Sequence, residues 1–161
     1  MERENSAFSS QVQKLKFSYI QRKKEIKNEF FLKNKALINC KNNSKNADKL
    51  IDELFKLANL KDKSLRDKIS ICAVGGYGRE ILAPFSDLDI LFLHNNELNQ
   101  KKLRNFIQTL LYPLWDLGLQ VGYAVRNIEE SRYYSNKDHV IQTSMLETRF
   151  ICGNKNIFFR V

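Results

Sequence analysis

The sequence predicts an α/β or α+β domain, with a small mixed sheet flanked by helices and a helical N-terminal region. Two short apolar runs, at 69–74 and 88–93, are typical of buried strands, and the segment 119–125 alternates in a strand-like way. Longer segments repeat apolar residues every three or four positions, as amphipathic helices do. Helices therefore come first, a strand–turn–strand–helix–strand unit follows, and further helices end the chain.

The N-terminal part of the chain is expected to be helical. Across residues 9–38, apolar side chains recur at steps of three or four with Lys and Glu between them, which predicts an amphipathic helix. The polar run 39–46 has no period and predicts a loop. A second helix is predicted at 47–59, with Asp48 near its N-terminus, where a carboxylate interacts favourably with the helix dipole. Residues 1–68 thus form the predicted helical N-terminal region.

Turn residues separate the elements of the middle of the chain. The strand predicted at 69–74 ends at two consecutive glycines, and Pro84 belongs to a turn before the strand at 88–93. A helical pattern follows at 98–117. Pro113 lies inside it and predicts a kink or a shortened helix.

The C-terminal part begins with the strand predicted at 119–125. Two more helices are predicted at 128–134 and 138–151. The tail at 157–161 is apolar, and the sequence identifies no partner for it.

Length and composition fit one folded domain in the cytoplasm. The 161 residues are 43% hydrophobic and 28% charged, which is usual for globular proteins. No run approaches the roughly 20 apolar residues of a membrane span, and the N-terminus does not resemble a signal peptide. Cys40, Cys72 and Cys152 lack the spacing of a zinc site, and we expect them to be reduced thiols.

The basic charge is concentrated in one part of the chain. The formal net charge is +9, of which residues 1–68 carry +8, with 17 Lys and Arg against 9 Asp and Glu. The basic residues are not interleaved with aromatic ones, as they are in a platform that stacks nucleic-acid bases. We therefore expect a solvated helix surface rather than a nucleic-acid site, while weak attraction to phosphates or to an acidic protein stays open.

Two carboxylates mark the candidate site. Asp87 and Asp89 are separated by one residue at the start of a predicted strand, so they point to the same face. Two neighbouring carboxylates repel each other, which raises the pKa of each. A divalent cation relieves that repulsion, and oxygen ligands favour Mg²⁺. Since two such ions can activate an attacking oxygen and stabilise a leaving pyrophosphate, both residues are candidate catalytic residues and metal ligands.

A glycine-rich turn precedes the carboxylates and is a candidate nucleotide-binding element. Gly75, Gly76 and Gly78 follow the end of a strand. Glycine permits positive φ and close approach of the backbone to a ligand, and we expect Gly76 to need that freedom. The N–H groups of such a turn suit a triphosphate. Arg79 could hold a phosphate in a forked contact, and Ser86 could hydrogen-bond a metal-bound phosphate.

Two other phosphate-binding motifs do not fit. A P-loop needs Gly-Lys after its glycine loop, and a dinucleotide fingerprint needs a third glycine where this chain has Ile81. A glycine turn or an Asp-x-Asp pair alone is more often structural than functional. Their combination is more specific, with a step of eleven residues from Gly76 to Asp87, and indicates a nucleotide site.

This segment resembles the nucleotidyltransferase signature of the DNA polymerase beta superfamily. The string GGYGREILAPFSDLDILFL at 75–93 is similar to one branch, the N-terminal domain of bifunctional PII uridylyltransferase/uridylyl-removing enzymes. YPLWDLGLQVG at 112–122, Val125-Arg126 and LETR at 146–149 also resemble that family. The resemblance covers about residues 69–153, the expected nucleotidyltransferase core, and leaves 154–161 as a truncated tail.

The resemblance implies an activity and its partners. Enzymes of this family transfer UMP from UTP to a tyrosine of the small PII nitrogen-signalling protein and release pyrophosphate. On this resemblance, Asp87 and Asp89 hold two Mg²⁺ ions, and Gly75 and Gly76 cradle the triphosphate. The attacking hydroxyl belongs to PII, whereas Tyr77 is a packing or rim residue of the turn.

The chain departs from the family pattern in two ways. The superfamily usually supplies a third carboxylate from a later strand, but the strand predicted at 119–125 contains no acid. Asp116 is the candidate, although it could simply cap the turn before that strand. The family enzymes also have later hydrolase and glutamine-sensing domains, so we expect a partial chain without uridylyl-removing activity or glutamine control.

Other functions remain open at this point. An adenylyltransferase or another nucleotidyltransferase-like domain would share the turn and the two carboxylates, because nothing in the residues selects UTP over ATP. A remnant that binds nucleotide or protein without turnover would fit the missing third carboxylate. Binding of nucleic acid by the basic N-terminal region is the least favoured alternative.

Overall fold

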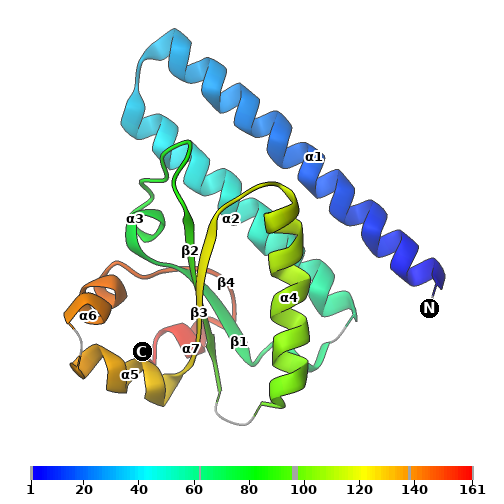
Figure 1. Cartoon of the computed structure of the whole chain (residues 1–161), viewed down its shortest axis with the longest axis vertical. Helices are drawn as coiled ribbons and strands as arrows, with labels where there is room; N and C mark the ends of the chain where they lie inside the picture. The colour runs from blue at the N-terminus through cyan, green and yellow to red at the C-terminus, as the bar shows by residue number, and fades with distance from the viewer. Residues whose placement is uncertain (1, 62, 96–97, 138, 161) are drawn as a thin grey trace.

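A mixed sheet lies at the centre of the computed structural model, which describes residues 2–61, 63–95, 98–137 and 139–160 (Figure 1). Within those ranges the strands are β1 (Ile69–Ala73), β2 (Leu88–His94), β3 (Val121–Asn127) and β4 (Arg149–Gly153). They lie in the order β3-β2-β1-β4. β1 is antiparallel to both of its neighbours, and β3 is parallel to β2. The predicted α/β class with a small mixed sheet is confirmed.

The N-terminal region is a pair of long helices, α1 (Glu2–Lys33) and α2 (Ala36–Lys61), which lie side by side in Figure 1. The chain turns at Asn34, whose φ is +49°. The predicted helix 9–38 therefore ends early, and the loop predicted at 39–46 is wrong because α2 runs through it.

The polar run is helical because its asparagines are buried and hydrogen-bonded. The Asn39 side-chain amide donates to the Ile26 carbonyl oxygen at 2.7 Å, and the Asn46 amide donates to that of Tyr19 at 3.1 Å. Buried amides are tolerated when their hydrogen bonds are made. These bonds join α2 to α1, so a face that is polar in sequence is an interior face of the fold.

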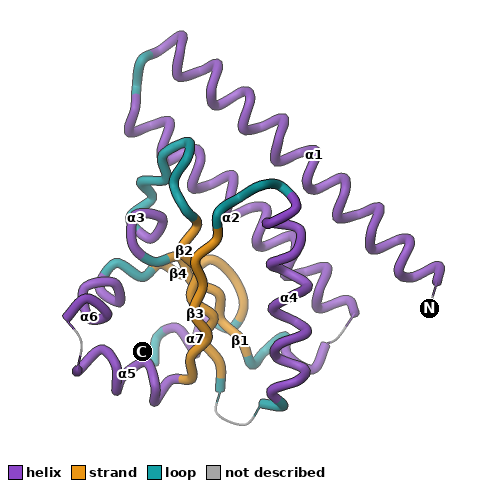
Figure 2. Tube along the Cα trace, in the orientation of Figure 1, coloured by secondary structure: helices purple, strands orange, loops and turns teal. Residues whose placement is uncertain are grey.

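The sheet is covered on both sides by helices, as Figure 2 shows. On one side, α2 and α4 (Gln100–Asp116) enclose the main core, which includes Leu54, Ile90 and Leu110. The helix predicted at 98–117 is thus confirmed, and it continues through Pro113. The other side carries a smaller cluster around Leu91 and Leu93. None of the described helices is long and apolar enough to cross a membrane.

The C-terminal part differs most from the sequence prediction. The helix predicted at 128–134 is present as α5 (Ile128–Lys137), but α6 (His139–Leu146) ends before the residues that form β4. Residue 138, where the longer helix was predicted to begin, lies outside the described residues. The short apolar run of β4 pairs with β1, with Phe150 opposite Cys72. This pairing with a distant strand, which periodicity does not reveal, overrides the helical pattern.

The apolar tail has a partner after all. Its first two residues belong to α7 (Lys155–Phe158), and residue 161 lies outside the described residues. Ile157 is buried in the smaller cluster with Cys72, Leu91 and Leu93. The tail therefore covers part of the sheet face on which Asp89 lies.

A short 3-10 turn (Lys63–Leu65) connects α2 to β1.

Candidate active site

The two aspartates lie where β2 begins. Asp87 is exposed directly before the strand, and Asp89 is its second residue and half-buried. Leu88 and Ile90 are buried on the opposite face in the main core, as the alternation of a strand requires. Burial raises the pKa of the Asp89 carboxyl, and the negative charge of Asp87 raises it further. The two carboxylates are therefore close enough to interact at a solvent-accessible edge of the sheet.

The glycine turn is a single helical turn, α3 (Gly75–Gly78), between β1 and β2. Its first bond to an earlier carbonyl runs from the Gly78 N–H to the Val74 oxygen at 3.0 Å. Because a helix begins without partners for its first N–H groups, those of Gly75, Gly76 and Tyr77 make no hydrogen bond within this turn. The turn faces Asp89, because a Cβ built on Gly75 would lie 3.4 Å from Asp89 Oδ2.

The expectation that Gly76 needs the freedom of glycine is wrong in one respect. Gly75, not Gly76, has the positive φ of +58°, a conformation that residues with a side chain rarely adopt. A Cβ on Gly76 would meet only ordinary contacts, the nearest at 3.7 Å from the Ile81 carbonyl oxygen. Gly78 has a third role, since a Cβ there would collide with the carbonyl oxygen of Glu147. It permits close packing of the turn against the segment before β4.

Gly122 on β3 belongs to the candidate site, although sequence reasoning missed it. It pairs with Asp89 in the parallel register, and a Cβ built on it would lie 2.6 Å from Asp89 Oδ1. The Asp89 carboxylate thus occupies the space that a side chain at position 122 would fill. An isolated glycine inside a strand is a known signal of close approach, and here the approaching group is the candidate metal ligand.

The other two candidate phosphate-binding residues, Arg79 and Ser86, make contacts with other groups of the protein. Arg79 forms an ion pair with Glu147, so its guanidinium faces a carboxylate in this structure. Ser86 is exposed beside Asp87, and its backbone N–H donates to the Ala83 oxygen at 3.1 Å. The structure therefore brings Gly75, Asp87 and Asp89 together, whereas the phosphate roles of Arg79 and Ser86 remain predictions.

A hydrogen-bonded clamp holds the glycine turn from behind. Arg149 on β4 makes two bonds to the Asp48 carboxylate, at 2.7 and 3.0 Å, and its Nε donates to the Gly78 carbonyl oxygen at 3.3 Å. The buried Tyr77 hydroxyl donates to Asp48 at 2.7 Å. Tyr77 is thus a packing residue, as expected. Asp48 lies in the middle of α2 and not near a helix start, so its predicted interaction with the helix dipole is replaced by this ion pair.

A third carboxylate does not join the two aspartates in the described part of the chain, where His, Cys, Asp and Glu form no metal-binding group of three or more. Asp116 ends α4, and its carboxylate lies 3.5 Å from the Lys16 amine of α1. On β3, the residue opposite Asp89 is Gly122, and Gln120 lies directly before the strand, where its carbonyl oxygen accepts from the Leu88 N–H at 2.9 Å. The positions next to the aspartates are therefore filled by an amide and a glycine.

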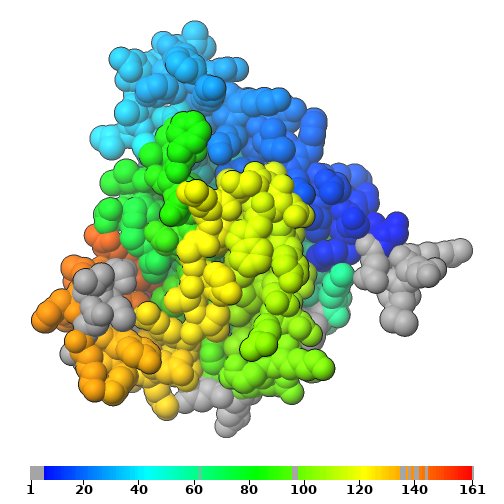
Figure 3. Space-filling view, viewed as in Figure 1, coloured from blue at the N-terminus to red at the C-terminus, as the bar shows by residue number. Residues whose placement is uncertain are grey.

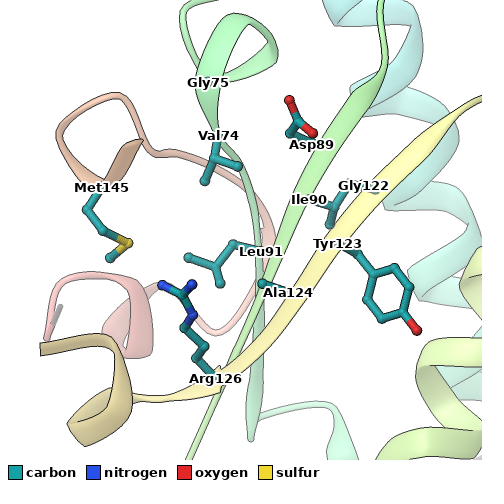
Figure 4. A pocket seen from close by; sticks show the side chains of 10 residues that line it. All are labelled: Val74, Gly75, Asp89, Ile90, Leu91, Gly122, Tyr123, Ala124, Arg126 and Met145. Carbon is teal, nitrogen blue, oxygen red and sulfur yellow. The ribbon is translucent and has the colours of Figure 1, made fainter. Parts of the chain in front are cut away.

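A groove runs from Asp89 down the same face of the sheet, with a volume of about 280 Å³. Figure 4 shows Asp89 at its upper end and Arg126 at its lower end. Leu91 and Ala124, which are paired across β2 and β3, form the apolar part between them, and Met145 of α6 lies to the side. β3 is an edge strand, and Figure 3 shows its residues (yellow) at the surface.

Comparison with known proteins gives a family match and close relatives. Residues 56–151 match the model of the nucleotidyltransferase domain family. The chain is 40% identical over 114 residues to the bifunctional uridylyltransferase/uridylyl-removing enzyme of Gluconobacter oxydans, and 39% identical over 115 residues to that of Azospirillum brasilense. It is also 45% identical over 91 residues to the enzyme of the same name from Caulobacter vibrioides.

These matches cover most of this chain but little of the relatives. The first two alignments include 71% of the chain, and the third includes 56%. The chain spans only 10 to 12% of the length of these curated relatives. The similarity is therefore to one part of each enzyme, while the family model, which matches residues 56–151, includes the turn, β2 and β3.

Proposed function

This chain belongs to the nucleotidyltransferase domain family, and we propose that it transfers UMP from UTP to a tyrosine of a PII nitrogen-signalling protein, with release of pyrophosphate. The observation that carries the proposal is the pair Asp87 and Asp89 beside the glycine turn, within a segment 40% identical to a uridylyltransferase. The choice of a uridylyl group rests on the name of those relatives, which are much longer than this chain, and the choice of PII as acceptor rests on the family resemblance of the motifs.

The site residues fit a divalent cation such as Mg²⁺. The raised pKa of Asp89 shows that its ionised form is disfavoured by burial and by Asp87, and a bound cation offsets both effects. All donors offered are oxygens, which suits Mg²⁺. Gly75 and Gly122 leave the space beside the carboxylate free of side chains. Bound there, Mg²⁺ would neutralise charge on the triphosphate and on the leaving pyrophosphate.

The residues of this chain bind and orient the reactants. Asp87 and Asp89 would hold the metal–triphosphate where β2 begins, and the N–H groups that open α3 would donate to phosphate oxygens. The acceptor tyrosine oxygen forms a bond to the α-phosphorus while the bond from that phosphorus to the β-phosphate oxygen breaks. Pyrophosphate leaves, and the phenol proton goes to water. The clamp of Asp48, Tyr77 and Arg149 keeps the turn in place during these steps.

The experiment compares nucleotides and one conservative variant. The chain is incubated with Mg²⁺, purified PII protein and either labelled UTP or labelled ATP. We expect label on PII from UTP, and none with Asp87→Asn, whose amide is a poor substitute for a charged metal ligand. Lys101→Gln, an exposed residue of α4, is the matched control and should leave transfer unchanged. If label reaches PII from ATP but not from UTP, the protein is an adenylyltransferase and the proposed choice of nucleotide is wrong.

A second candidate function is nucleotide binding without transfer. It is favoured by one observation, which is that the residues next to the two aspartates are Gln120, directly before β3, and Gly122 on β3, neither of which is an acid. A superfamily site with only two carboxylates has less charge to hold a second metal ion. Mg²⁺-dependent binding of UTP with no label on PII would support this function over the first.

A further inference from the structure

Arg126 is the basic group that lines the groove below Asp89. It lies on β3, four residues after Gly122, and its partner in the register is Leu93. Gly122, Ala124 and Arg126 alternate along one face of the strand. Asp89 and Arg126 therefore share a face, and Arg126 lies roughly 13 Å along β3 from Gly122, the residue opposite Asp89, at about 3.3 Å per residue.

The Arg126 guanidinium is available to a ligand. It is half-buried and lies 5.5 Å from the centre of the Tyr134 ring, while none of the ion pairs found among the described residues includes it. Arg79 and Arg149, by contrast, are paired with Glu147 and Asp48. Figure 4 shows the Arg126 side chain extending along the groove toward Leu91 and Met145, rather than away from the sheet.

The groove is polar at its ends and apolar in between. A ligand with its phosphates at Asp89 and the glycine turn would lay its sugar and base along Leu91, Ala124 and Met145 toward Arg126. Flat apolar contact suits a base ring, and arginine offers only donors to the ring edge. A carbonyl on that edge is satisfied by the guanidinium, whereas an amino group in the same place meets a second donor.

Building on the proposed function, we propose that Arg126 is a specificity-determining residue that donates to the carbonyl edge of a uracil base. Uracil carries a carbonyl at position 4, where cytosine carries an amino group. The two bases are otherwise nearly the same in size, so their comparison isolates this contact. UTP is thus selected over CTP, and over ATP, whose corresponding edge also presents an amino donor. The residue that selects the base thus lies on β3, whereas the residues proposed to bind the metal and the phosphates lie at β2 and α3.

The test measures the dissociation constants of UTP, CTP and ATP in the presence of Mg²⁺, by calorimetry, for the full chain and its variants. We expect the full chain to prefer UTP to CTP by about tenfold or more, as a good contact to a base edge allows. Arg126→Gln should remove most of that preference, because its amide can serve either base. Arg126→Lys should lose it in part, since it keeps the charge but not the fork. Arg104→Gln, an exposed arginine of α4, is the control for the loss of charge.

Each other outcome overturns the inference in a recognisable way. Equal weakening of all three nucleotides by Arg126→Gln, with partial rescue by Arg126→Lys, would assign Arg126 to the phosphates instead. Unchanged affinities in a folded variant would remove it from the site. If the full chain binds no Mg²⁺-nucleotide, the proposed function itself fails. Binding without preference for UTP leaves that function standing and rejects the role of Arg126 alone.

Discussion

Gly122→Ala changes the candidate site without removing a single polar group. The new Cβ would lie 2.6 Å from Asp89 Oδ1, whereas ordinary contacts begin at 3.4 Å, so the carboxylate must retreat by about 0.8 Å. The atom that moves is the end of a flexible side chain and not backbone. A misplacement of about 1 Å in a catalytic group can cost about a hundredfold in rate. We therefore expect transfer to fall by about ten- to a hundredfold.

The fold should tolerate the same substitution. Alanine restricts the unfolded chain more than glycine, which stabilises by about 0.4–1 kcal/mol, and a strained Asp89 rotamer costs about 0.5–1.5 kcal/mol. The net change in the free energy of unfolding should stay within about 1 kcal/mol. Val125→Ala, on the same strand but the opposite face, is the control.

Initial rates of transfer and thermal unfolding of the metal-free protein are measured for all three proteins. Val125→Ala should keep the rate of the unmodified chain. The reasoning is refuted if Gly122→Ala transfers at the full rate, because the Asp89 carboxylate would then not depend on the space above Gly122. It is also refuted if the variant unfolds readily while each folded molecule keeps full activity.

Three further predictions follow from the same contacts. The pKa of Asp89 is raised above its ordinary value of 3.8, so the folded state holds this proton more tightly than the unfolded state and loses stability as pH rises through that raised value. In thermal melts across pH, metal-free Asp89→Asn should therefore be at least as stable as the unmodified chain near pH 7, with that advantage gone below pH 3.8. A lower melting temperature of the variant at pH 7 would contradict this. Asp48→Asn removes the carboxylate partner of the largely buried Arg149 and should lower the free energy of unfolding, measured with denaturant, by about 2–3 kcal/mol, less than the about 3–5 kcal/mol of a fully buried pair. The control Asp52→Asn removes a surface pair with Lys56 and should lower it by less than about 0.5 kcal/mol. Equal losses in the two variants would reject the clamp. Burial raises the pKa of the Cys72 thiol to about 12 and also raises that of the Cys152 thiol. A thiol reagent near pH 8 should therefore modify the partly exposed Cys40 in the native protein, and all three cysteines after denaturation. Rapid modification of Cys72 in the native protein would instead show that its strand opens.

The central strands and their site were predictable because their signals are local. An apolar run bounded by glycines defines β1, and the alternation of Leu88 and Ile90 with Asp89 fixes which face the carboxylate takes. These patterns need no knowledge of distant residues. The sequence therefore indicates both the fold class and the two aspartates at the start of β2.

The features that the sequence did not reveal all depend on long-range contacts. β4 exists because Phe150 pairs with Cys72, and the polar run of α2 is helical because Asn39 and Asn46 bond carbonyls of α1. Gly122 joins the candidate site only through its register with Asp89. Pairing across the sheet and the burial of amides are settled by tertiary structure, which a periodic pattern does not encode.

The position of the label within UTP tests the central claim most directly. Two parallel reactions with Mg²⁺ and purified PII protein use UTP labelled at the α-phosphate or at the γ-phosphate. Because the proposed reaction breaks the bond between the α- and β-phosphates, we predict that the α-label is found on a PII tyrosine and that the γ-label is released as pyrophosphate. A γ-label on PII, or both labels remaining in intact UTP, would contradict nucleotidyl transfer by this chain.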